Sequence, residues 1–222
     1  MAHYLRLGLY AEGPTDYGLL SPLLRRLTEA LCTEARAPIE IPDVEALDAP
    51  RAFQREDRAT RILEAARAFW GGSCVLFIHA DGGGDPARKE AEQVTPGAQL
   101  IRASLRRGAC VAVIPVKEVD AWTLVDGEAL RGALGTTLGD TELHVVSRPA
   151  DVERITDPKV EWRSALGAAL GPAGRRRART GDYYARVGER VELAKLRQVP
   201  AFLRLEDELR AALREIGILP PI

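Results

Sequence analysis

The chain has 222 residues, a length that suits one domain or one domain with an appendage. Hydrophobic residues make up 46% of it and charged residues 28%, which is enough apolar material for an ordinary core. The formal net charge is -1, which excludes a chain that is basic overall. Any attraction to nucleic acid must therefore come from a local patch.

The three cysteines, Cys32, Cys74 and Cys110, are far apart and show no zinc-binding spacing. We expect them to be small buried hydrophobes in a reducing cytosol. The N-terminus lacks the regions of a signal peptide, and no apolar run approaches the length of a membrane span. The sequence thus predicts a cytoplasmic protein with no membrane partner.

The N-terminal segment predicts a strand followed by a helix. Alternating leucines form the strand, which ends at Glu12. Pro14 suits a first helical position and Asp16 suits the positive first turn, so a helix should open here. A stripe of leucines continues that helix through Pro22, where we expect a kink.

The middle of the chain alternates strands and helices. A short strand is predicted within residues 40–47 and a helix over residues 58–70. The apolar run 74–78 is typical of a strand buried on both faces of a parallel sheet. A helix that opens at residue 95 and a strand at 109–114 follow.

The rest of the chain is mainly helical. The polar segment 85–93 fits either a loop or a short exposed helix, and the basic segment 171–179 is predicted to be a loop. Helices are predicted at residues 118–133, 157–170, 187–196 and 201–216. The fold class is therefore α/β: a Rossmann-like, three-layer core with a mainly parallel sheet over residues 1–133, and a helical C-terminal extension packed on it over residues 134–222.

Acidic residues follow three of the predicted strands. Glu12 follows the first strand, Asp81 follows the central one, and Glu118 and Asp120 follow the strand that ends near Ile114. In an open parallel sheet the carboxyl ends of the strands meet at one edge, where ligands bind. Mg²⁺ takes oxygen ligands, often one or two carboxylates together with substrate phosphates. We expect these acids to hold Mg²⁺ or Mn²⁺.

Further residues are candidates for contact with a nucleic acid. The glycines at 82–84 should let a phosphate backbone come close. Basic side chains of the second half of the chain are candidate phosphate ligands. They are Arg175, Arg176, Arg177, Arg179 and Lys159. The arginine run equally fits a solvated loop, and the lysine equally fits a structural helix start.

Each acidic candidate also has a purely structural interpretation. Glu12 fits a helix-capping carboxylate, and Asp81 before glycines fits an Asx-turn. His79 fits a hydrogen-bonded core histidine. Asp120 fits a surface acid beside the core aromatic Trp122.

These motifs resemble those of the TOPRIM (topoisomerase–primase) domain. Glu12-Gly13-Pro14-Thr15-Asp16 resembles its Glu motif, and His79-Ala80-Asp81-Gly82 resembles its Asp-x-Asp motif. Residues 118–126 are similar to the acidic-x-Trp signature of a TOPRIM-like subfamily encoded beside AbiL-type or OLD-like ATPases. Three C-terminal matches extend the resemblance over nearly the whole chain: Asp157-Pro158-Lys159, Tyr183-Tyr184 and Pro200-Ala201-Phe202.

The resemblance implies a metal-dependent nuclease that hydrolyses phosphodiester bonds of DNA or RNA in phage defence, with an OLD or ABC-like ATPase as partner. It leaves a homodimer open. Glu12 would be a general base or metal ligand and Asp81 the main metal ligand. Glu118 and Asp120 would complete the site or lie just behind it.

His79 departs from the family pattern, because it stands where TOPRIM has the first Asp of Asp-x-Asp. Imidazole is a poor ligand for Mg²⁺ and prefers transition metals. Three alternatives stay open: a catalytic site that uses Mn²⁺ and His79, a metal held by Asp81 and Glu12 alone, and a catalytically inactive module. The inactive module would bind a partner protein or nucleic acid without cleaving it.

Overall fold

The computed structural model describes residues 3–177 and 180–221, and the side chains of 172–177 and 180 are outside that description. Its centre is a parallel sheet of five strands in which β1 (His3–Tyr10), β4 (Ser73–His79) and β5 (Ala109–Val113) lie side by side. Two short strands, β2 (Ile39–Glu40) and β3 (Glu45–Leu47), both pair with β1. The predicted α/β fold with a mainly parallel sheet is confirmed.

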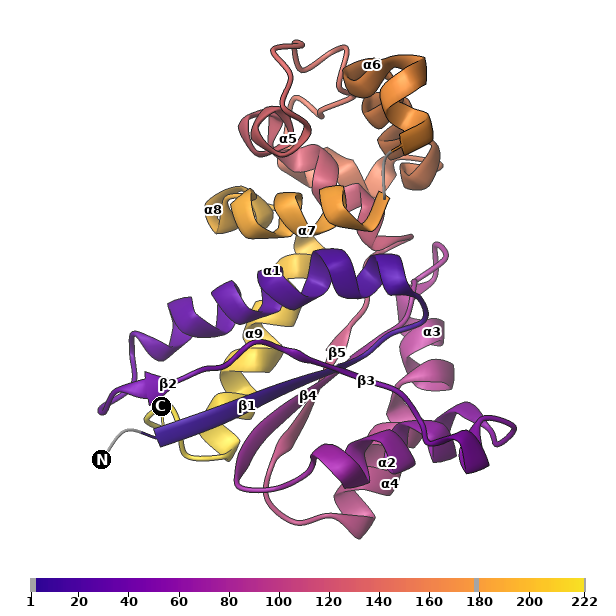
Figure 1. The fold of residues 1–222 in the computed structure, drawn as a ribbon. Helices are drawn as coiled ribbons and strands as arrows, with labels where there is room; N and C mark the ends of the chain where they lie inside the picture. The colour runs from indigo at the N-terminus through magenta and orange to yellow at the C-terminus, as the bar shows by residue number, and fades with distance from the viewer. Residues whose placement is uncertain (1–2, 178–179, 222) are drawn as a thin grey trace.

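Helices cover both faces of this sheet (Figure 1). On one face, α1 (Pro14–Cys32) and α9 (Pro200–Glu215) pack on the odd-numbered residues of the strands. On the other face, α2 (Arg58–Phe69) and α4 (Thr95–Ser104) pack on the even-numbered residues of β4. This alternation follows from the period of two along a strand and produces three layers.

A further group of helices lies over α1, on its side away from the sheet (Figure 1). It consists of η2 (Val119–Val125), α5 (Gly127–Leu134), η3 (Pro149–Arg154), α6 (Pro158–Arg177), α7 (Thr180–Arg190) and α8 (Leu193–Leu196). A β-carbon on Gly188 of α7 would lie 2.4 Å from the carbonyl oxygen of Leu19, so glycine is required where α7 crosses α1. Buried residues of this group and of the sheet form one hydrophobic cluster.

Several predicted elements differ in detail from the structure. The predicted strand within residues 40–47 is two short strands, with Pro42 between them, because proline cannot donate to a strand ladder. The polar segment at 85–93 is a helix, α3 (Pro86–Gln93). α1 runs through Pro22 as one helix. Residues 119–125 form a 3₁₀ rather than an α-helix.

The predicted loop at 171–179 is wrong as far as Arg177, because α6 continues to that residue. Its helical path breaks at Gly171, whose φ of 62° and ψ of 177° suit glycine. Arg179 and the residue before it lie outside the described residues. α7 begins at Thr180, seven positions before the predicted start at Val187.

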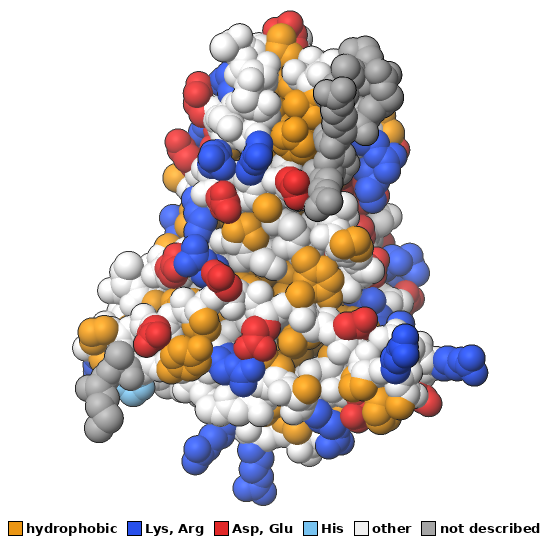
Figure 2. Space-filling model, viewed as in Figure 1, with side chains coloured by type: hydrophobic (Ala, Val, Ile, Leu, Met, Phe, Trp, Pro, Cys, Tyr) orange, Lys and Arg blue, Asp and Glu red, His pale blue; other side chains and the backbone are white. Residues whose placement is uncertain are grey.

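Charges of both signs are interspersed over the part of the surface described in Figure 2, with no extended patch of one sign. None of the helices in the described ranges is long and apolar enough to cross a lipid bilayer.

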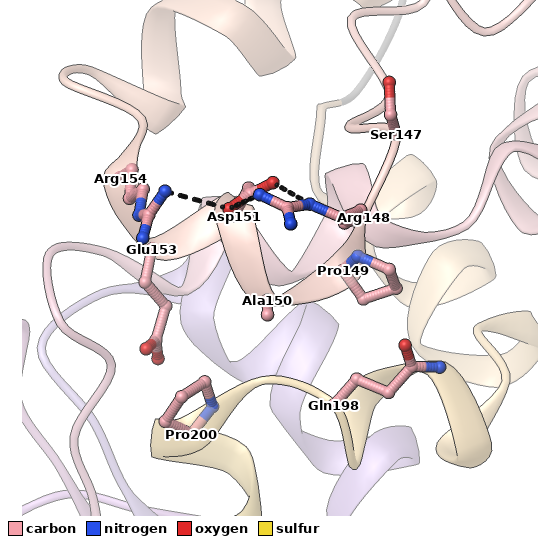
Figure 3. Close-up of a pocket in the computed structure, with 9 residues that line it drawn as sticks. All are labelled: Ser147, Arg148, Pro149, Ala150, Asp151, Glu153, Arg154, Gln198 and Pro200. Carbon is pink, nitrogen blue, oxygen red and sulfur yellow. Dashed lines mark hydrogen bonds and ion pairs between the residues drawn. The ribbon is translucent and has the colours of Figure 1, made fainter.

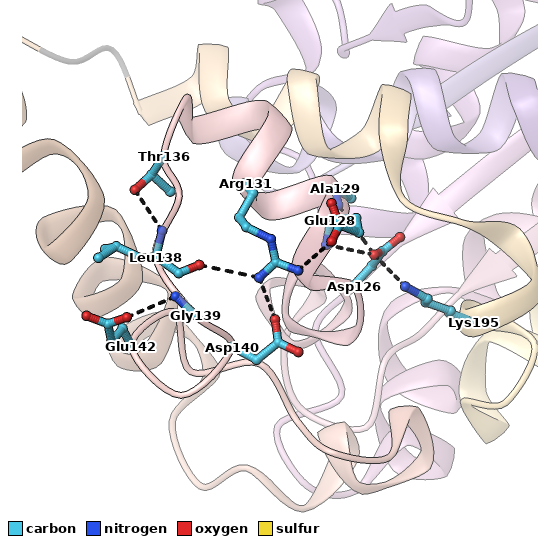
Figure 4. A network of polar contacts seen from close by, with 10 residues as sticks. All are labelled: Asp126, Glu128, Ala129, Arg131, Thr136, Leu138, Gly139, Asp140, Glu142 and Lys195. Carbon is cyan, nitrogen blue, oxygen red and sulfur yellow. Dashed lines mark hydrogen bonds and ion pairs between the residues drawn. The ribbon is translucent and has the colours of Figure 1, made fainter.

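The buried carboxylate of Asp126 ties α5 to α8 (Figure 4). Oδ1 accepts hydrogen bonds from the N–H groups of Glu128 and Ala129 and from Lys195 Nζ, the last at 2.7 Å. Oδ2 accepts the N–H of Glu192 at 3.0 Å. Burial alone would raise the pKa of Asp126, but these donors outweigh it and hold that pKa below its usual value. Asp126 is therefore a structural hub, although it belongs to the acidic signature at 118–126.

We expect Asp126→Asn to lower the free energy of unfolding by about 2–3 kcal/mol at neutral pH, the scale of a charge-assisted hydrogen bond. Because the folded pKa of Asp126 is depressed, its ionised form stabilises the fold above its ordinary pKa, and this contribution disappears as the pH falls through the folded value. Urea unfolding should show a smaller difference in the free energy of unfolding between parent and variant at acidic pH than at neutral pH. A constant difference would contradict this role.

Candidate functional site

The strand register places the predicted acids at one edge of the sheet. Tyr10 pairs with Ile78 and His79 pairs with Val113, so β1, β4 and β5 end at nearly the same level. The segments that carry the acids leave the sheet together at this carboxyl edge.

A glycine turn fixes the Asp81 segment against the exit of β5. The N–H groups of Gly83 and Gly84 donate to the carbonyl oxygens of Lys117 and Val116, at 3.1 and 2.8 Å. A β-carbon on Gly82 would lie 2.1 Å from the carbonyl oxygen of Pro115. The close approach that these glycines permit is thus made by the protein's own backbone, and it brings the Asp81 and Glu118 segments together.

His79 is fully buried and points its ring into the acids. Its Nδ1 lies 2.8 Å from the carbonyl oxygen of Val113, which can only accept, so Nδ1 carries the proton. Nε2 then lies 3.4 Å from Asp81 Oδ1 and 4.0 Å from Asp16 Oδ2. Burial would lower the pKa of His79, but the carboxylates of Asp81 and Asp16 outweigh it and raise that pKa above its usual value.

Asp16 is a member of the site that the sequence analysis did not assign to it. Its Oδ2 accepts the N–H of Gly13 at 2.9 Å, as the helix-start interpretation requires, and the same carboxylate faces His79. Burial raises the pKa of Asp16, and the charge of Asp81 adds to the rise. Its position in the first turn of the helix that follows the first strand was the available signal.

Glu118 and Asp120 bring two more carboxylates to the same edge. Burial raises the pKa of each, and the charge of Asp81 adds to each rise. Lys159 Nζ lies 3.9 Å from Glu118 Oε1 and opposes the rise. Lys159, a predicted phosphate ligand, therefore lies beside the acids.

Three buried polar atoms in this group have no hydrogen-bond partner: His79 Nε2, Asp81 Oδ1 and Glu118 Oε2. The contact between His79 Nε2 and Asp81 Oδ1 is close enough for an ionic interaction, but its geometry does not satisfy a hydrogen bond. Unpaired buried polar atoms are costly, so these three atoms are available to bind a ligand, an ion or a water.

Asp120 is oriented by a residue from the C-terminal half of the chain. Tyr184 of α7, itself buried, donates its hydroxyl hydrogen to Asp120 Oδ1. The Tyr184 ring packs on Trp162 of α6, with ring centroids 4.8 Å apart. Thr123 Oγ donates to the Asp120 carbonyl oxygen at 2.7 Å, so the residue is held at both ends.

The other predicted site residues lie apart from this group or outside the description. Glu12 lies at the same edge, but its carboxylate is 44% exposed and lies 3.5 Å from Arg58 Nη1. Arg58 also donates to the carbonyl oxygen of His79 at 2.6 Å. The side chains of the predicted phosphate ligands on the basic segment are outside the described residues: Arg175, Arg176, Arg177 and Arg179.

Within the described ranges, no three His, Cys, Asp or Glu side chains close around a point that could hold a metal ion. The unpaired oxygens of Asp81 and Glu118 still fit a hard cation with few protein ligands, since Mg²⁺ often keeps several waters and takes the rest from substrate. The residues present therefore fit Mg²⁺ or Mn²⁺ bound by one or two carboxylates.

A hollow of about 610 Å³ lies away from these acids, between η3 and the start of α9 (Figure 3). Its central carboxylate, Asp151, is already bound by Arg148 and Arg154, at 2.7 and 3.2 Å. None of the predicted acids lines it. The unpaired buried polar atoms of His79, Asp81 and Glu118 lie at the carboxyl edge rather than in this hollow.

The chain matches no protein-family model, and comparisons with curated proteins and with solved structures give no significant match either.

We expect Gly82→Ala to lower the free energy of unfolding by about 1–3 kcal/mol, the usual cost of overpacking, because its β-carbon would overlap the Pro115 carbonyl oxygen. Gly71→Ala is the matched control, since no atom lies within 4 Å of its β-carbon position. Urea unfolding of the two variants measures the difference, and equal stabilities would show that the turn is not tightly held.

Tyr184→Phe keeps the ring but leaves Asp120 without its hydroxyl donor. We expect the free energy of unfolding to fall by about 2 kcal/mol, because a buried carboxylate loses a hydrogen bond. Tyr183→Phe is the control, because that neighbouring ring is only partly buried and packs against Arg186. If chemical denaturation gives both variants the parent's stability, Tyr184 does not hold Asp120.

Proposed function

We propose that this protein is a TOPRIM-like, metal-dependent phosphodiesterase that cleaves DNA or RNA. One observation carries the proposal: carboxylates from three separate segments meet at the carboxyl edge of a parallel sheet, and buried polar atoms among them lack partners. These carboxylates belong to Asp16, Asp81, Glu118 and Asp120. Burial and neighbouring like charges raise the pKa values of Asp16, Glu118 and Asp120, and such shifts are typical of functional sites.

In this proposal Asp81 and Glu118 are the residues that would hold Mg²⁺ or Mn²⁺, because each carries an unpaired buried oxygen. A divalent cation there would acidify a bound water and stabilise charge on a phosphate. Asp16 and Asp120 would add negative charge around the cation, since the charge of Asp16 acts on His79 and that of Asp120 acts on Glu118.

Other side chains position the acids or partly offset their charge. His79 is fixed through Nδ1 and directs Nε2 at Asp81, so the protonated ring would offset the charge of that carboxylate. Tyr184 fixes Asp120, and Lys159 partly offsets the charge of Glu118. The role of Glu12 as base or ligand is supported by the resemblance alone, because its carboxylate is paired with Arg58. A role in phage defence with an ATPase partner has the same support.

The test is a nuclease assay with Mg²⁺ and with Mn²⁺ on DNA, RNA and tRNA. We expect cleavage that falls by at least about 100-fold in Asp81→Asn and Glu118→Gln, the scale on which a positioned catalytic group contributes. Asp43→Asn is the control, because that carboxylate is 98% exposed. Cleavage that survives the combined Asp81→Asn and Glu118→Gln change would place the active site elsewhere.

A second function, a TOPRIM-like module that binds a partner protein or nucleic acid without cleaving, is favoured by one observation. His79, a buried imidazole and therefore a poor ligand for Mg²⁺, lies 3.4 Å from Asp81 Oδ1 where the family pattern has an Asp. Calorimetry with Mn²⁺ separates the two functions: the enzyme should bind the ion, whereas the module should show no binding up to millimolar metal.

A further inference from the structure

A small hollow lies directly beside the acidic group. It has a volume of about 250 Å³ and lies between the glycine turn and the start of α6. Its lining residues are Gly83, Lys117, Glu118, Thr156, Asp157 and Pro158. A water takes up about 30 Å³ in the liquid, so the hollow has room for a phosphate group and part of its hydration shell. Glu118 belongs to both the hollow and the acidic group.

Lysines gather around this hollow. The chain has only four lysines among its 31 basic residues, and three of them lie here. Lys117 lines the hollow, and Lys159 Nζ lies 3.9 Å from Glu118. The Cε atom of Lys89 lies 3.6 Å from the place that a β-carbon on Gly83 would take. The fourth, Lys195, is bound to Asp126.

Two of these ammonium groups are not neutralised by a carboxylate. Lys117 Nζ donates to the carbonyl oxygen of Thr156 at 2.8 Å, a neutral acceptor that leaves two of its hydrogens available. Among the ion pairs of the described residues, none involves Lys117 or Lys89, whereas Lys159 is offset by Glu118. A compact ammonium with free hydrogens at the mouth of a hollow is suited to a phosphate oxygen.

We propose that Lys117 and Lys89 form a phosphate-binding subsite for a nucleic-acid strand, which anchors a phosphate next to the one held at the acids. The inference rests on the proposed function for its substrate class, but binding at the subsite requires no cleavage. A strand phosphodiester presents two non-bridging oxygens, one for each ammonium group.

The experiment measures binding of single-stranded oligothymidylate in EDTA over roughly 50 to 200 mM salt. Each phosphate contact contributes about 0.7 to the slope of log K against log salt on a single strand. We expect Lys117→Gln and Lys89→Gln each to reduce that slope by about 0.7, and Lys117→Arg to retain it. Arg106→Gln is the control, because that exposed residue precedes β5 at the opposite edge of the sheet.

Reduced slopes in both lysine variants would support the subsite even if the parent cleaves nothing, in which case only the proposed nuclease function fails. An unchanged slope in Lys89→Gln, which breaks no side-chain hydrogen bond or ion pair of the described residues, would overturn the subsite. Parallel titration with inorganic phosphate separates the two sources of the anion. Lysine-dependent binding of inorganic phosphate without binding of the oligonucleotide would overturn the assignment to a strand, and so would no binding of either.

Discussion

The site depends on one close contact, the approach of the Gly82 backbone to the carbonyl oxygens of Pro115 and Val116. The sheet brings the ends of β4 and β5 to the same edge, but parallel register alone does not set the distance between the loops that follow. The glycine turn sets it, through the absent side chain at Gly82 and the N–H groups of Gly83 and Gly84. As a result, Asp16 and Glu118 lie close to Asp81, and burial together with the charge of Asp81 raises the pKa of each of them.

Such a gathering of like charges is unfavourable for folding, and the surrounding residues limit its cost. His79 supplies a ring nitrogen against Asp81, Lys159 supplies a positive charge against Glu118, and Tyr184 donates to Asp120. Two of these three residues come from α6 and α7. The helices beyond residue 133 therefore complete the electrostatics of an edge that the sheet begins. Gly18 and Gly188 allow α7 to lie close enough to α1 for Tyr184 to reach Asp120.

Local pattern was sufficient to predict β1, β4 and β5 and the acids that follow them. The apolar run before Asp81 and the alternation before Glu12 each predict buried residues over a short segment, and the fold buries those residues. The prediction of a loop at 171–179 is wrong because glycine and proline were interpreted as the end of a helix. The backbone instead resumes a helix after Gly171. Long-range partners had no local signal: Arg58 pairs with Glu12, and Tyr184 binds Asp120 across 64 positions. The position of Asp16 in the sequence predicted only a role at the start of the helix.

We propose that Asp81 and Glu118 draw a divalent cation to the carboxyl edge of the sheet. The most direct measurement is paramagnetic broadening of backbone amide signals during titration with Mn²⁺, which reports proximity to the ion without any substrate. We expect the amide signals of Asp16, Asp81 and Glu118 to broaden first, while that of Arg106 at the opposite edge stays sharp. Broadening that begins around Asp151, or that is absent from the carboxyl edge throughout the titration, would contradict it.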